Sequence, residues 1–122
     1  MFSETQIIAK SWLVKEVCNL VLLPYQLSVD KIFLIGSYAN GNATNRSDLD
    51  YLVQLKGGTR LGQYYPAWKD ILAIQKQLGN RVHVIFGREE AQKSLLQKHG
   101  KKYREIPQGG IYGVTCGSST PS

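Results

Sequence analysis

The stretch IGSYANGNATNRSDLDYLV, residues 35–53, joins two apolar runs through a loop of small and polar residues. The loop opens with Gly36 and Ser37. It ends with Asp48 and Asp50, which are separated by one residue. Residues two apart on a β-strand point to the same face of a sheet, so both carboxylates are expected on one face. The stretch therefore predicts a strand, a tight turn and a second strand that carries paired carboxylates.

Paired carboxylates on one strand face favour a bound cation, because two such groups repel each other without one. Mg²⁺ commonly binds through one or two carboxylates together with substrate phosphates. At the other end of the loop, Gly36 permits a tight turn, and Ser37 offers a hydroxyl and backbone N–H groups suited to phosphate. A phosphate-binding turn followed on the next strand by a metal-binding pair is the arrangement that phosphoryl and nucleotidyl transfer require.

Apolar periodicity and Gly or Pro breakers predict the other elements of the chain. Helices are expected over 4–22, 66–78 and 88–99, with a short helix or turn over 37–43; strands are expected over 31–36, 48–55, 81–86 and 111–114. In the helix over 66–78, Trp68, Ile71, Leu72 and Leu78 are expected to face inward. This order predicts an α/β (α+β) fold with a small mixed β-sheet flanked by helices.

Length and composition indicate one soluble domain. The 122 residues are expected to form a single domain over 1–115 with a flexible tail over 116–122. No apolar run approaches the roughly 18 residues that a membrane span needs. The beginning of the sequence lacks the layout of a signal peptide, so a cytoplasmic location is expected. Cys18 falls within an apolar helical pattern and is expected to be a small buried hydrophobic residue.

The formal charge of +6 and the pI near 9.4 suit an anionic partner such as a nucleotide or RNA. Much of the excess lies in residues 93–104, which carry five Lys and Arg residues and no acidic residue. A solvated helix face followed by a basic loop is one interpretation, and RNA binding is another. No aromatic-interleaved signature accompanies the charges, so RNA is only weakly supported.

The central stretch resembles the signature of the DNA polymerase β nucleotidyltransferase superfamily, specifically its minimal nucleotidyltransferase (MNT) branch. The family pattern of small residues followed by Ser-Asp-x-Asp falls here on Gly36, Ser37, Ala39, Gly41, Ser47, Asp48 and Asp50. Domains of this family often close with an Ile, a Gly and an aliphatic-Tyr pair, which here resemble Ile106, Gly110, Ile111 and Tyr112. The resemblance spans most of the chain and implies a polymerase β palm-like fold.

The resemblance implies transfer of a nucleoside monophosphate from an NTP to a protein or RNA acceptor. The expected nucleotide is ATP, so the expected group is AMP. Gly36, Ser37 and Ser47 would hold the triphosphate. Asp48 and Asp50 would be catalytic and would bind Mg²⁺ or Mn²⁺. A third carboxylate on a neighbouring strand would complete a second metal site. Small members of the family resemble antitoxins or partners of helical HEPN proteins, so an HEPN-like partner is expected. A chain of 122 residues is expected to hold no second domain for a large acceptor, so a homodimer is the alternative.

The chain departs from the family at the third carboxylate, because His83 stands at its expected place in the strand over 81–86. His83 could ligate a metal or act as a general base. It could instead mark a site that binds nucleotide but transfers poorly, which would make the protein a catalytically weakened antitoxin or partner-binding protein. A third interpretation is an ordinary strand histidine, with the third acid elsewhere; Glu89 and Glu90 are then the candidates.

Overall fold

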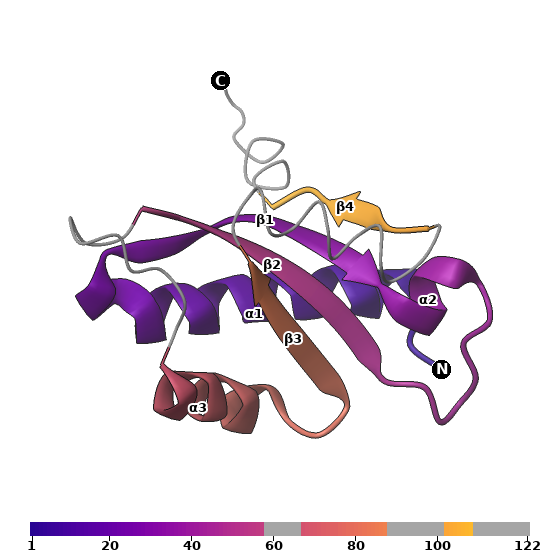
Figure 1. Cartoon of the computed structure of the whole chain (residues 1–122). Coiled ribbons are helices and arrows are strands. Elements are labelled where there is room, and N and C mark those ends of the chain that lie inside the picture. Colours follow the sequence, from indigo (N-terminus) through magenta and orange to yellow (C-terminus); the bar gives the residue numbers. More distant parts are fainter. Residues whose placement is uncertain (58–66, 88–101, 109–122) are drawn as a thin grey trace.

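The computed structural model describes residues 1–57, 67–87 and 102–108. Within them, helices α1 (Glu4–Leu22), α2 (Gly36–Asn40) and α3 (Trp68–Leu78) combine with strands β1 (Leu27–Ile35), β2 (Leu49–Gly57), β3 (Val82–Gly87) and β4 (Arg104–Ile106). A 3-10 turn over Leu23–Tyr25 links α1 to β1. The four strands form one sheet in the order β3-β2-β1-β4 (Figure 1).

The sheet is mixed. Strand β1 lies antiparallel to both β2 and β4, whereas β2 and β3 are parallel. A parallel neighbour requires a crossover connection, and α3 lies in the one between β2 and β3. This architecture confirms the predicted α+β fold with a small mixed sheet and helices packed on it.

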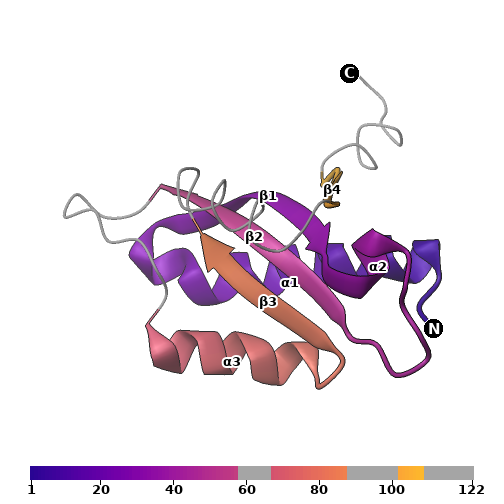
Figure 2. The ribbon, with the colours of Figure 1, turned by 45° about the vertical axis from the view of Figure 1, so that its right-hand side comes forward.

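Helices α1 and α3 lie together against one face of the sheet (Figure 2). Their apolar side chains and the inward residues of every strand form one buried cluster. Tyr51 of β2 is fully buried in this cluster, and its hydroxyl donates a hydrogen bond to the carbonyl of Ile7 at 2.5 Å. The opposite face of the sheet holds a smaller buried cluster of Phe33, Ile35 and Leu52.

Helix α1 has the predicted bounds and a clear sequence signal at its start. Ser3 and Gln6 form a capping box, in which each side chain accepts a hydrogen bond from the other's backbone N–H. Cys18 is a free thiol in the core, as expected, and burial raises its pKa to about 12. Among the described residues, no helix is long and apolar enough to cross a lipid bilayer.

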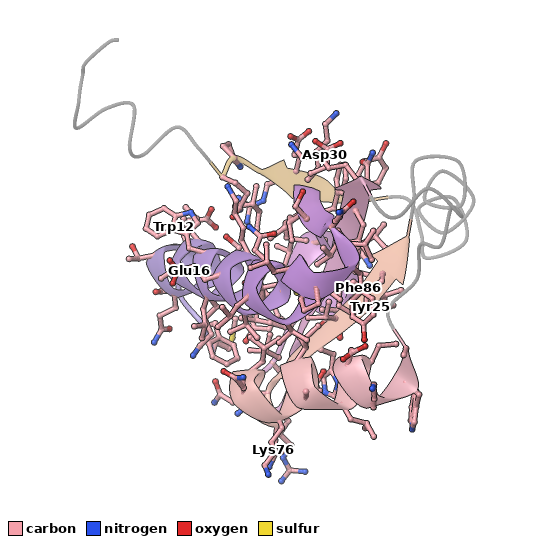
Figure 3. The ribbon with its side chains drawn as sticks, turned by 90° about the vertical axis from the view of Figure 1, so that its left-hand side faces the viewer. Trp12, Glu16, Tyr25, Asp30, Lys76 and Phe86 are labelled. Atoms are coloured by element: carbon pink, nitrogen blue, oxygen red, sulfur yellow. The ribbon has the colours of Figure 1, made fainter. Side chains whose placement is uncertain are left out.

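The inward face predicted for α3 is wrong at two positions. Ile74 and Leu78 are buried, but Trp68 is 71% exposed and Leu72 is 51% exposed. Leu72 and Ile74 are two residues apart, about 200° around a helix, so they cannot share a face. Trp68 is the first residue of α3, and helical side chains point toward the N-terminus, so its ring extends beyond the packed turns. Figure 3 shows Lys76 on the side of α3 that faces away from the sheet.

The strands also differ from their predicted bounds. Strand β1 begins at Leu27, earlier than position 31, and a bulge at Asp30 keeps its apolar residues inward. The short strand β4 was not predicted. It pairs with β1 and is tied to α1 by Arg104, whose guanidinium donates to both carboxylate oxygens of Glu4, at 2.6 and 3.0 Å. The predicted helix over 88–99, the strand over 111–114 and the tail over 116–122 lie outside the described residues.

Candidate functional site

Three of the predicted site residues meet where β2 and β3 begin. The parallel register places Asp50 directly opposite His83. Asp48 immediately precedes β2, and its Oδ2 lies 3.0 Å from His83 Nε2. The alternating neighbours Leu49, Tyr51 and Val82 are buried under the helices, so these three polar residues share the opposite face, as the strand periodicity predicted.

Gly36 brings the turn after β1 against Asp50. It adopts a φ of +75°, a backbone conformation that favours glycine. A Cβ at this position would lie 2.5 Å from Asp50 Oδ2, closer than Cβ atoms approach other heavy atoms in proteins. The preceding residue, Ile35, pairs with Asp50 across the β1–β2 ladder. The dihedral angle therefore favours glycine here, and any larger residue would have to displace the Asp50 carboxylate.

Ser37 follows in the first turn of α2, where it is half-buried. Its carbonyl accepts hydrogen bonds from the backbone N–H groups of Gly41 and Asn42, so the carbonyl closes the short helix. The contact of Ser37 with a triphosphate stays a prediction.

Ser47 has a structural role in the loop before Asp48. Its hydroxyl accepts a hydrogen bond from the Thr44 N–H at 2.8 Å, and its own N–H donates to the Thr44 carbonyl at 3.0 Å. Serine hydroxyls commonly close turns in this way. The contact of Ser47 with a triphosphate stays a prediction.

Arg81 belongs to the site although the motif does not contain it. Its Nε donates to Asp48 Oδ1 at 2.9 Å. Its Nη2 donates to the carbonyls of Asn45 and Ser47, at 3.0 and 2.7 Å. An arginine directly before a strand is an ordinary surface feature in sequence. The signal becomes visible only when that strand is known to run parallel to the one that follows Asp48.

The electrostatics keep Asp48 ionised. The hydrogen bond from Arg81 is the largest cause that lowers its pKa below the ordinary aspartate value, and the hydrogen bond from His83 lowers it further. Two other carboxylates are engaged elsewhere, since Glu4 pairs with Arg104 and Asp70 contacts the Tyr25 hydroxyl. Glu89 and Glu90, the alternative third acids, lie outside the described residues.

The residues fit a divalent ion that brings some of its own ligands. Within the described residues, no group of three or more His, Cys, Asp or Glu side chains is arranged to hold a metal ion by itself. Asp48 and Asp50 nevertheless offer hard carboxylate oxygens on one face, and Mg²⁺ is usually bound through one or two carboxylates plus substrate phosphates and water. The donor set therefore suits a metal that arrives with a nucleotide.

Comparisons with known proteins identify the family of the chain. The family model described as a nucleotidyltransferase domain matches residues 10–107, which include β1, α2, β2 and β3. No curated protein matches the chain. A solved structure of a provisionally assigned nucleotidyltransferase from Sulfolobus solfataricus is similar at 18% identity, with a TM-score of 0.47 and 83% of each chain covered. From the family match, which spans most of the chain, we conclude that this protein belongs to the nucleotidyltransferase domain family, as its MNT-like motif predicted.

Proposed function

We propose that this protein transfers a nucleoside monophosphate, AMP from ATP in the first instance, to a hydroxyl group of a protein or RNA acceptor. The observation that carries the proposal is the contact between the two halves of the motif. The Gly36 turn lies against Asp50. Asp48 lies two residues before Asp50 and on the same face of the sheet, because the alternating residues Leu49 and Tyr51 are buried on the other face. A triphosphate held at this turn would lie beside both carboxylates.

In the proposed reaction, the acceptor oxygen forms a bond to the α-phosphorus, and the bond from that phosphorus to the bridging oxygen breaks. Pyrophosphate leaves with the electron pair of the broken bond. Bound Mg²⁺ or Mn²⁺ would supply neutralisation of the phosphate charge. Asp48 and Asp50 would hold that ion, and Gly36, Ser37 and Ser47 would orient the triphosphate.

The acceptor proton needs a base. Asp48 is ionised, so the hydrogen bond at 3.0 Å is donated by His83 Nε2. A neutral imidazole that donates through Nε2 keeps its lone pair on Nδ1. His83 Nδ1 is therefore the atom that would accept the proton, while Asp48 fixes the tautomer and the ring orientation.

Labelled ATP tests the proposal. The protein is incubated with α-labelled ATP, Mg²⁺ or Mn²⁺ and candidate acceptors, and label on the acceptor is measured. We expect transfer by the parent and a loss of at least about 100-fold in the Asp48→Ala/Asp50→Ala double variant, since ligands of the catalytic metal are removed. Asp30→Ala, a carboxylate in the bulge of β1, is the matched control. Equal transfer by the double variant would contradict the proposal.

A second candidate is a catalytically weakened protein that acts by binding, as an antitoxin-like partner of an HEPN-like protein or as a homodimer. The supporting observation is His83, which stands opposite Asp50 where the family places a carboxylate. A neutral ligand in place of an anion weakens Mg²⁺ binding at a second site. This candidate predicts no transfer with a verified partner, and gain of transfer in His83→Asp.

Two further expectations remain predictions. RNA binding through residues 93–104, most of which lie outside the described residues, would be steeply salt-dependent and would survive the double aspartate substitution. The cytoplasmic location is also a prediction, and fractionation of cells that express the tagged chain would test it.

A further inference from the structure

We infer that Arg81 is a positioning residue of the nucleotide site, which holds Asp48 and the backbone of residues 45–47 in the geometry that binds a metal–triphosphate. The inference rests on the proposed function and adds to it a residue from outside the motif. Arg81 lies in the turn between α3 and β3, more than thirty positions after Asp48, to which it donates a hydrogen bond.

The side chain of Arg81 reaches three acceptors within four consecutive residues. Its Nη2 binds the carbonyls of Asn45 and Ser47, and its Nε binds Asp48 Oδ1. The guanidinium is a rigid planar fork, so these hydrogen bonds fix the carbonyls and the carboxylate relative to one another. A lysine ammonium carries the same charge on a flexible stem and cannot reproduce this fork. The three hydrogen bonds of Arg81 therefore fix the end of the loop, residues 45–48, at the start of β2.

Arg81 is itself held from several directions. Its carbonyl accepts the Leu49 N–H at 2.9 Å, which anchors its main chain to the start of β2. Its guanidinium carbon lies 5.3 Å from the ring centroid of Phe2, within range of a cation–π contact. The Phe2 N–H in turn donates to the hydroxyl of Tyr38, a residue of α2. Arg81 is therefore held by contacts that involve β2, the N-terminal residue Phe2 and, through Phe2, α2.

Arg81 leaves Asp48 able to bind a metal. An ionised carboxylate has about four lone-pair positions. Arg81 uses one on Oδ1 and His83 uses one on Oδ2, so each oxygen keeps acceptor capacity. The charge of Arg81 repels a free divalent cation, but a metal–triphosphate carries net negative charge and is not repelled in this way. If Arg81 instead competed with the metal for Asp48, its removal would tighten binding of the metal–nucleotide complex.

The test measures affinity for Mn²⁺ with a non-hydrolysable ATP analogue by titration calorimetry, in the parent, Arg81→Ala, Arg81→Lys and Arg46→Ala. Residues that orient metal ligands typically change metal affinity about 10- to 100-fold. We expect at least about 10-fold weaker binding in both Arg81 variants. Arg46 is exposed and lies two residues before Asp48, so Arg46→Ala removes an equal charge nearby and should stay within about twofold.

A spectroscopic readout separates positioning from a general loss of structure. Electron paramagnetic resonance of the bound Mn²⁺–nucleotide complex, at saturation and below the unfolding temperature, should change in Arg81→Ala and Arg81→Lys and stay unchanged in Arg46→Ala. Parent-like affinity and spectrum in Arg81→Ala, or tighter binding, would overturn the inference alone. An equal loss in Arg46→Ala would also overturn it, because charge would then explain the effect. If the parent binds no metal–nucleotide complex, the proposed function fails as well.

Discussion

His83 Nε2 lies 3.0 Å from the carboxylate of Asp48, although the two residues are 35 positions apart in the chain. The contact arises because β3 runs parallel to β2 and sets His83 opposite Asp50. An imidazole in this place shares a hydrogen bond with Asp48, whereas an acidic residue would add a third negative charge. The balance between stability and metal binding at the site should therefore depend on residue 83.

Replacing His83 with aspartate should make the protein less stable without metal and more responsive to metal. A third carboxylate beside Asp48 and Asp50 adds like-charge repulsion, for which we expect a loss of about 1 kcal/mol in the free energy of unfolding. Millimolar Mg²⁺ should restore this loss by binding the folded state. Thermal unfolding of His83→Asp with and without Mg²⁺ measures both effects. His83→Asn is the control, and an equal response to Mg²⁺ in both variants would contradict the expectation.

Alanine at Gly36 should cost more than alanine at Gly41. Both glycines have positive φ, so each substitution carries backbone strain of about 1–2 kcal/mol. Only at Gly36 would the new Cβ meet another group, Asp50 Oδ2 at 2.5 Å, whereas the Cβ at Gly41 finds open space. Urea unfolding should show an additional loss of about 1 kcal/mol or more for Gly36→Ala. Equal losses would mean that the turn does not press on Asp50.

Helix α3 should be sensitive to truncation at Ile74 and insensitive at Leu72. Ile74 is 1% exposed, and Ile74→Ala is expected to lower the free energy of unfolding by about 2–4 kcal/mol through lost burial and a cavity. Leu72 is 51% exposed, and Leu72→Ala should stay within about 0.5 kcal/mol. Denaturant unfolding of the two variants compares them directly. A large loss at Leu72 would restore the inward face that periodicity first predicted.

The ion pair between Glu4 and Arg104 should add pH-dependent stability. The hydrogen bonds from Arg104 hold the pKa of Glu4 below its ordinary value. A carboxyl group with a lowered folded pKa stabilises the fold above its unfolded pKa, and the effect is lost as pH falls through the folded pKa. Both side chains are about half exposed, so we expect only about 0.5–1 kcal/mol at pH 7.

A double-mutant cycle with Glu4→Gln and Arg104→Met measures this coupling by chemical unfolding. The coupling should be present at pH 7 and smaller at about pH 3, below the ordinary glutamate pKa. It should also weaken at high salt, because the pair is solvent-exposed. A coupling that is equal at both pH values would show that ionisation of Glu4 is not its source.

The amino-acid sequence was enough to predict the family and the local elements on either side of the motif. Alternating apolar residues fix which face of β2 is buried, so the shared face of Asp48 and Asp50 follows from local periodicity. The capping residues Ser3 and Gln6 likewise mark the start of α1. The tight turn at Gly36 is also predictable from sequence, because it depends on the dihedral angles of a single glycine.

The family resemblance pointed to His83, but the tertiary structure set its place beside Asp48 and added Arg81 to the site. No local pattern specifies that β3 pairs with β2 in the register that opposes His83 to Asp50, because register depends on contacts far apart in sequence. The same pairing brings Arg81 to the carbonyls of the loop, and the sheet places the Gly36 turn against Asp50. The motif thus supplies the carboxylates, and the fold decides which charges surround them.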